Sequence, residues 1–285
     1  DLDSRFIKAN KATLTKMGLN SFDELLGKTD FEIFNDEHAI EAREDEKKII
    51  ENRISVINKI EKETWRDGKI TWASTTKIPL IDEKDNVYGT FGITRDITHL
   101  KKSEDIKDAL FKISTAVTSQ NNINELYEFI HKSISALMSA ENFYIALYHQ
   151  ETDTVSFPYY VDQVDETPVE RKTGKGLTEY VLRTGKAQLI TAELDLALRK
   201  IGETSLIGEP TQIWLGVPLN VKGKTIGVIV VQDYSDSTTY SDEEKEILIY
   251  VSEQIALAID KKRKEKKIIQ YSEELKETNA AKDKF

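Results

Sequence analysis

The chain has 285 residues, a length that suits two domains of roughly 100–150 residues better than one. Hydrophobic residues make up 39% of the sequence, which is enough for packed cores and argues against wholesale disorder. A net charge of −10 argues against a general nucleic-acid binder. The absence of Cys excludes disulfides, zinc–thiolate sites, iron–sulfur clusters, cysteine nucleophiles and a covalently attached bilin, and it fits a cytoplasmic protein.

No apolar run is long enough to span a membrane, since the longest obvious one covers residues 226–231. The sequence begins without Met or a signal-peptide pattern, so we expect it to be part of a longer protein. Residues 261–285 hold nine Lys/Arg against five Asp/Glu, a net charge of +4. We interpret their densest cluster, 261–267, as a solvated helix surface.

Residues 1–98 mix short helices with three predicted strands. Apolar residues alternate with polar ones in 69–81, which is typical of a strand with one buried face. Residues 55–65 and 87–97 have the same character and are separated from 69–81 by polar turns. These segments predict an antiparallel meander.

Residues 99–121 change to helical periodicity. Ile106, Leu110, Ile113 and Val117 recur at heptad spacing, which predicts packing against a partner helix. The stripe is short, so packing against its own domain is a second reading.

Residues 122–260 form a second α/β unit. Predicted helices and strands cover 123–140, 143–149, 154–160, 176–184, 213–221 and 225–233. A last helix is expected to begin at Ser241, since Ser241 and Glu244 form a capping-box pattern. It meets no Gly or Pro before the end, as in an extended signalling helix, and its heptad positions are Ile268, Tyr271, Leu275, Thr278, Lys282 and Phe285.

Five segments of the first unit together resemble a PAS domain: 5–10, 25–29, 68–72, 77–80 and 92–98. The resemblance covers residues 1–98 and implies a sheet of five strands. Residues 5–10 match the second strand, so the resemblance implies a truncated domain whose first, central strand lies upstream of Asp1.

Five segments of the second unit resemble a GAF domain of the kind found in sensor kinases: 142–148, 156–160, 176–182, 214–219 and 227–232. The resemblance implies an antiparallel sheet with helices on one side. The fold class is therefore expected to be α+β: a truncated PAS-like domain at 1–98, a connecting helix at 99–121, a GAF-like domain at 122–260 and a signalling helix or coiled coil at 261–285.

Residues 279–285 resemble the entry into the dimerisation helix of a histidine kinase. The resemblance implies a homodimer, downstream kinase domains in the same protein and a response regulator as partner. The fragment itself is expected to have no enzymatic activity, since it lacks both catalytic parts and a phosphate-binding loop. Two alternatives remain: another output, such as a cyclic-dinucleotide enzyme or a phosphatase, or a ligand-free dimerisation scaffold.

Aromatic and polar residues of each unit could line a small-molecule pocket, although core packing is the other reading. The GAF-like candidates are Tyr144, Tyr148, Phe157, Tyr159, Tyr160, Asp162, Thr178, Trp214 and Gln232. On strand alternation, Phe157 and Tyr159 are expected to share a face. The PAS-like candidates are Phe31, Phe34, Trp72, Tyr88 and Phe91.

The sequence names no ligand or cofactor and contains no helical histidine pair for a metal. The carboxylates of the first unit are read as ordinary surface acids: Asp45, Glu46, Glu61 and Glu63.

Overall fold

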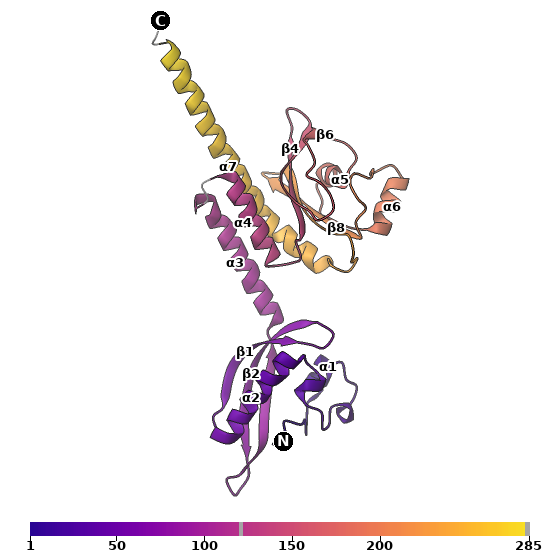
Figure 1. Ribbon diagram of the computed structural model, residues 1–285, viewed down its shortest axis with the longest axis vertical. Coiled ribbons are helices and arrows are strands. Elements are labelled where there is room, and N and C mark those ends of the chain that lie inside the picture. Colours follow the sequence, from indigo (N-terminus) through magenta and orange to yellow (C-terminus); the bar gives the residue numbers. More distant parts are fainter. Residues whose placement is uncertain (120–121, 283–285) are drawn as a thin grey trace. The chain divides into compact units, whose positions relative to one another are not determined.

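The structure is a computed structural model that describes the backbone of residues 1–119 and 122–282 and the side chains of residues 1–116 and 122–275. It divides into two compact units, Asp1–Glu104 and Asp105–Phe285, and each is described by itself (Figure 1). Within the described residues, no helix is both long enough and apolar enough to cross a membrane.

The first unit has a three-stranded antiparallel sheet in the order β1-β2-β3, which confirms the predicted meander. Its elements are α1 (Lys11–Lys16), the 3-10 turns η1 (Phe22–Glu24) and η2 (Asp30–Glu32), α2 (Asp36–Asn52), β1 (Val56–Thr64), β2 (Ile70–Ile81) and β3 (Val87–Asp96). Helix α2 packs on one face of the sheet and contacts all three strands.

The strand expected at residues 5–10 does not form. Phe6 donates a backbone hydrogen bond to Lys28 (2.9 Å) and accepts one from Gly27 (3.0 Å). A strand requires a ladder of such bonds along several residues, and this contact is limited to one. The segment therefore belongs to no sheet.

The second unit is built on a six-stranded sheet in the order β6-β5-β4-β9-β8-β7, with every pair antiparallel. Its elements after α3 (Thr98–Ser119) are α4 (Ile123–Ser135), β4 (Asn142–His149), β5 (Thr154–Val161), β6 (Arg171–Lys172), α5 (Leu177–Thr184), β7 (Gln188–Thr191), α6 (Ala192–Lys200), β8 (Ile213–Val221), β9 (Lys224–Asp233) and α7 (Asp242–Lys282). The predicted helices and strands are present, although the helix predicted over 123–140 ends at Ser135. Elements β6, β7 and α6 carried no clear sequence signal.

Helices lie on both faces of this sheet rather than on one. Figure 1 shows α4 and α7 on one side and α5 and α6 on the other. Side chains alternate between the two faces along each strand. Phe143 and Leu215 belong to the larger apolar cluster with α4 and α7, whereas Tyr144 and Trp214 belong to a smaller cluster with α5.

The heptad stripe of α3 packs within its own unit. Ile113 is completely buried, and Ile106 and Leu110 lie partly buried against the larger apolar cluster. The side chain of Val117 lies outside the described residues. The second interpretation of this stripe, packing against its own domain, is therefore the one that holds for Ile106, Leu110 and Ile113.

Helix α7 has two different halves. The predicted capping box is present, since Glu244 Oε2 accepts hydrogen bonds from the backbone N–H (2.8 Å) and the hydroxyl (2.6 Å) of Ser241. Leu248, Val251 and Ile255 are completely buried in the larger cluster. Beyond residue 260 the helix is largely exposed.

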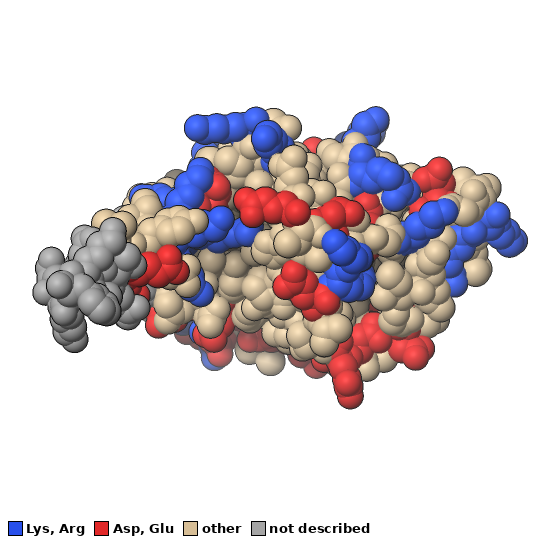
Figure 2. Space-filling view, turned by 90° about the horizontal axis from the view of Figure 1, so that it is seen from above, with Lys and Arg blue, Asp and Glu red and all other residues tan. Residues whose placement is uncertain are grey.

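The basic run of α7 is solvated on one side only: Lys261, Lys264, Lys266 and Lys267 are exposed, whereas Lys262 and Arg263 are partly buried. Lys264 pairs with Asp260 (2.5 Å) and Lys262 with Glu265 (3.2 Å), at the i,i+4 and i,i+3 spacings of neighbours on a helix. On the face of the molecule shown in Figure 2, Lys and Arg side chains are interspersed with Asp and Glu side chains.

Candidate functional site

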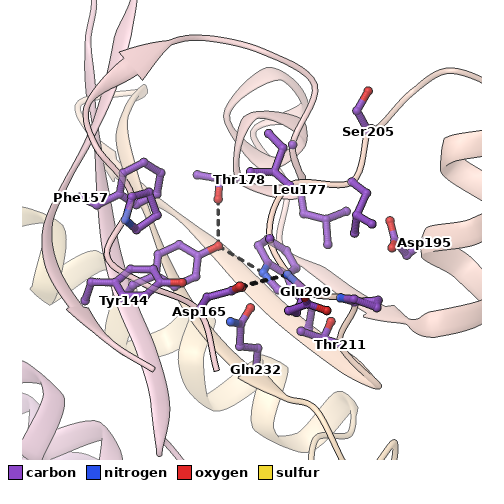
Figure 3. Close-up of a pocket in the computed structure, with 18 of the residues that line it drawn as sticks. Tyr144, Phe157, Asp165, Leu177, Thr178, Asp195, Ser205, Glu209, Thr211 and Gln232 are labelled. Carbon is purple, nitrogen blue, oxygen red and sulfur yellow. Dashed lines mark hydrogen bonds between the residues drawn. The ribbon is translucent and has the colours of Figure 1, made fainter. Parts of the chain in front are cut away.

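A cavity of about 270 Å³ lies on the α5 side of the six-stranded sheet (Figure 3). Strands β4, β5, β8 and β9 form its floor, the start of α5 forms one wall, and two loops, 162–170 and 202–212, close over it. Its lining residues are Tyr144, Phe157, Tyr160, Asp165, Glu166, Pro168, Arg171, Gly176, Leu177, Thr178, Asp195, Ser205, Leu206, Ile207, Gly208, Glu209, Pro210, Thr211, Trp214 and Gln232.

Aromatic rings form the apolar wall of the cavity. Tyr144 and Tyr160 are stacked with ring centroids 5.2 Å apart, and Phe157 meets the edge of Tyr144 at 5.9 Å. The indole of Trp214 lies over Gly216, where an added Cβ would stand 2.1 Å from the ring. Glycine at this position therefore lets the indole lie flat against β8.

Hydrogen bonds tie three of the lining side chains together. Trp214 Nε1 donates to the Tyr144 hydroxyl (3.3 Å), which lies 2.9 Å from the Thr178 hydroxyl. Burial raises the pKa of Tyr144 to about 12, although the hydrogen bonds with Thr178 and Trp214 partly oppose the shift. The Tyr144 phenol is therefore protonated at neutral pH.

A salt bridge at the cavity edge was not anticipated from the sequence. Arg171 Nη2 lies 2.9 Å from Glu179 Oε1, and the guanidinium stacks 4.9 Å from the centre of the Phe157 ring. Glu179 is buried in the first turn of α5. Arg171 lies in a strand of only two residues, and Glu179 lies in a helix eight residues later. No sequence pattern predicts such a pair, so the salt bridge is evident only from the structure.

The two loops over the cavity are joined by one carboxylate. Asp165 accepts from the backbone N–H of Glu209, with its two oxygens 3.0 and 3.2 Å away. The Tyr234 hydroxyl beneath lies 3.1 Å from Asp165 Oδ2 and 2.9 Å from Asp162 Oδ1. Burial, followed by the hydrogen bond and negative charge of Asp162, raises the pKa of Tyr234. This contact of Asp165 and Glu209 is called the loop latch below.

Family models match both units. One described as the GAF domain matches residues 120–260, and one described as the PAS fold matches residues 1–102. The chain contains a PAS domain followed by a GAF domain. These bounds lie close to the expected domains at 1–98 and 122–260.

Similar solved structures include the GAF domain of a phosphoenolpyruvate-protein phosphotransferase from Coxiella burnetii, at 15% identity and a TM-score of 0.48, covering 57% of this chain and 97% of that one. Another is free methionine-R-sulfoxide reductase from Neisseria meningitidis, at 12% identity and a TM-score of 0.46, covering 57% and 93%. No curated protein matches the chain. The assignment of the PAS and GAF domains rests on the family models.

Six of the nine residues expected to line the GAF pocket do line the cavity: Tyr144, Phe157, Tyr160, Thr178, Trp214 and Gln232. Asp162 lies behind the lining, where it accepts a hydrogen bond from Gln232 Nε2 (2.7 Å). Tyr148 lies outside, and its hydroxyl donates to Asp153 in the β4–β5 turn (3.2 Å).

Tyr159 is on the opposite face of the sheet, so the expectation that it shares a face with Phe157 is wrong. The β4–β5 register shifts between Ile145 and Leu147, so β5 carries one residue more than β4 over this stretch. Pro158 lies in the shifted segment, where a residue without an N–H can be accommodated. Phe157 and Tyr160 consequently face the cavity, and the Tyr159 hydroxyl lies 2.9 Å from His131 on the α4 side.

The five residues expected to line a PAS pocket do not gather. Phe31 lines a small cavity of about 130 Å³ together with Asp30, Arg43 and Glu46. Phe34 is buried against Trp65, with ring centroids 4.8 Å apart. Trp72 lies under the Lys101 ammonium, and Tyr88 and Phe91 are both about half exposed at 48%.

The interface between α2 and the PAS sheet is built from ion pairs, so its acids are not ordinary surface acids. Lys59 of β1 pairs with Asp45 of α2 (2.5 Å) and with Glu61 of its own strand (3.3 Å), and Lys77 of β2 pairs with Glu46 of α2 (2.7 Å). Outside this interface, buried Glu63 of β1 pairs with Lys16 of α1 (2.6 Å).

The charge state of this interface follows from its burial. Burial by itself favours the neutral amine of Lys77, but the carboxylates of Glu46 and Asp30 outweigh it and raise the pKa. Lys77 therefore remains charged, and the interface offers little apolar room for a ligand.

We expect Gly208→Ala to destabilise the GAF domain by about 1–3 kcal/mol more than Gly202→Ala. Both glycines have positive φ, +78° and +76°, and therefore impose a similar backbone cost on alanine. An added Cβ at Gly208 would stand 2.4 Å from Asp165 Oδ2, whereas at Gly202 it meets nothing within 4 Å. Urea unfolding of the two variants measures the difference, and equal losses would show that the loop latch contributes nothing.

Proposed function

We propose that this chain is the sensory region of a cytoplasmic sensor histidine kinase, in which a small molecule binds the GAF cavity and α7 carries the signal to a downstream kinase. The observation that supports this proposal is that β8 contributes side chains both to the GAF cavity and to the apolar cluster against which α7 packs. Trp214 lines the cavity, while the next residue, Leu215, is completely buried in the cluster that contains the first half of α7. A ligand that displaces Trp214 would therefore also shift the surface on which α7 rests.

The second half of α7 supports an output through a partner helix. Ile268, Tyr271 and Leu275 are about two-thirds exposed and follow heptad spacing, with exposed fractions of 67%, 66% and 66%. Exposed Leu257 lies 14 residues before Tyr271 and continues the same seam. Thr278 and Lys282, expected on this seam, have side chains outside the described residues, and Phe285 is likewise outside them.

A second copy of the chain is the partner that this seam fits best. Identical chains aligned in parallel bring each heptad position against itself, so every apolar residue meets an apolar partner. Between Leu257 and Ile268 the seam passes Lys261 and Lys264, which would lie close to the same residues of the second copy. We therefore propose a parallel homodimer with firm contacts after the basic run and loose contacts within it.

We expect the double variant Ile268→Glu and Leu275→Glu to reduce the protein to a monomer. Each substitution places like charges opposite each other and removes roughly 1.5–3 kcal/mol of apolar burial per side chain. Light scattering at micromolar concentration measures the mass. Leu196→Glu is the matched control, because Leu196 is also an exposed leucine on a helix but lies on α6, outside the seam. A dimer that survives the double variant, or a control that dissociates as readily, would contradict the seam.

We expect Trp214→Ala to change the separation of the α7 helices in the dimer. The chain contains no Cys, so Glu273→Cys gives a single spin-label site on the exposed part of α7. Pulsed electron resonance then measures the distance between labels on the two protomers. Val155→Ala is the control, since Val155 is buried on the same face of the sheet without lining the cavity. Equal distance distributions in both variants would contradict the relay.

The proposed output makes a prediction about the gene. A helix carrying a phosphoacceptor histidine is expected to be encoded shortly after Phe285, followed by an ATP-binding domain. The coding sequence downstream decides this directly. A cyclic-dinucleotide enzyme or a phosphatase domain there would contradict the kinase while leaving the PAS and GAF sensors in place.

A further inference from the structure

Three hydrogen-bond donors meet at one wall of the GAF cavity. They are the indole N–H of Trp214 and the hydroxyls of Tyr144 and Thr178, joined at 3.3 and 2.9 Å. Figure 3 shows the Tyr144–Thr178 contact at the edge of the cavity. Tyr144 is 7% exposed and Thr178 is 4% exposed, so neither hydroxyl is freely hydrated.

These three donors share only two hydrogen bonds. If Tyr144 donates to Thr178, the Thr178 hydrogen lacks an acceptor; if Thr178 donates to Tyr144, the Tyr144 hydrogen lacks one. No other acceptor lies within hydrogen-bond distance of either hydroxyl among the described residues. Both residues line the cavity, so the surplus hydrogen can be satisfied by a molecule inside it. Buried donors are rarely left without an acceptor, because this costs about 1–3 kcal/mol.

The charges around the cavity select against an anion. Four carboxylates are among its lining residues: Asp165, Glu166, Asp195 and Glu209. Asp195 is paired with Arg199 at 2.9 Å, so the excess negative charge comes from the other three. Arg171 is the one Lys or Arg in that described lining, and its charge is offset by Glu179 at 2.9 Å. A phosphate or carboxylate would therefore enter a site with excess negative charge, where partial burial strengthens the repulsion.

The size and walls of the cavity limit the ligand further. Its 270 Å³ is slightly below the roughly 300–1,000 Å³ of sites for drug-sized ligands, which suits one or two rings. Tyr144, Phe157 and Tyr160 offer ring faces and edges to a planar molecule.

We infer that the GAF cavity binds an uncharged, planar heteroaromatic molecule of one or two rings, whose carbonyl oxygen or ring nitrogen accepts the surplus hydrogen of the Tyr144–Thr178 pair. This inference rests on the proposed role of the cavity as the sensor site. It adds the ligand's chemistry: one acceptor atom, a flat apolar body and no negative charge.

Calorimetric titration of the full chain with three related compounds tests the ligand class. Oxindole has a bicyclic body with a carbonyl acceptor, indole has the bicycle without that acceptor, and indole-2-carboxylate carries a negative charge. We expect oxindole to bind about tenfold more tightly than either of the others, as one added hydrogen bond would give. Tighter binding of indole-2-carboxylate than of oxindole would overturn the ligand class while supporting the cavity as a sensor site.

Two variants test the contact itself. Thr178→Val leaves the surplus hydrogen on the Tyr144 hydroxyl, 2.9 Å from the position of the Thr178 oxygen. A ligand seated against Thr178 loses its donor, so this variant should weaken oxindole binding about tenfold while leaving indole unchanged. Thr178→Ser retains the hydroxyl and should restore oxindole binding. Unchanged indole binding also shows that the variants fold. Equal oxindole affinity in the Val and Ser variants would overturn the inference.

Absence of binding has a defined meaning as well. If none of the three compounds binds at about 1 mM, corresponding to a binding free energy of about −4 kcal/mol, the ligand class is wrong. In that case the spin-label comparison of Trp214→Ala with Val155→Ala still tests the proposed relay from the cavity to α7, independently of the ligand class.

Discussion

The alternation of side chains along β8 is the constraint on which the rest of the GAF domain depends. Successive strand residues point to opposite faces, so Trp214 reaches the cavity and Leu215 reaches the α7 side. Both residues are almost completely buried. Since protein interiors are packed as densely as organic crystals, a change of shape on one face has little free volume to absorb it. The site and the long helix are thus separated by a single layer of backbone.

The two domains fill their interiors in different ways. The GAF sheet packs apolar and aromatic side chains on both faces and leaves a cavity on one of them. The PAS sheet instead meets α2 through ion pairs of Lys59 and Lys77. A partly buried ion pair contributes little net stability, but removing one member leaves a charge without compensation. The contact between α2 and the PAS sheet therefore depends on both members of each ion pair, whereas the GAF domain leaves a cavity among its side chains.

Strong periodicity made much of the fold predictable. The strands of the PAS meander and β8 and β9 of the GAF sheet follow apolar patterns that depend only on neighbouring residues. The start of α7 was predictable as well, because the Ser241–Glu244 capping box is local. Strand β7 and helix α6 were not, since a four-residue strand exists only by pairing with β8.

The sequence by itself determined which aromatic residues were available, where the regular elements lie and that no cysteine chemistry is possible. Only the tertiary structure decided which face each aromatic residue takes, because the register shift beside Pro158 reverses the simple alternation after Phe157. It also decided the polar contacts of the cavity. Asp165 meets Glu209 across 44 residues and Tyr144 meets Trp214 across 70. Local patterns report the geometry of adjacent residues, whereas these contacts depend on strands and loops that the folded sheet brings together.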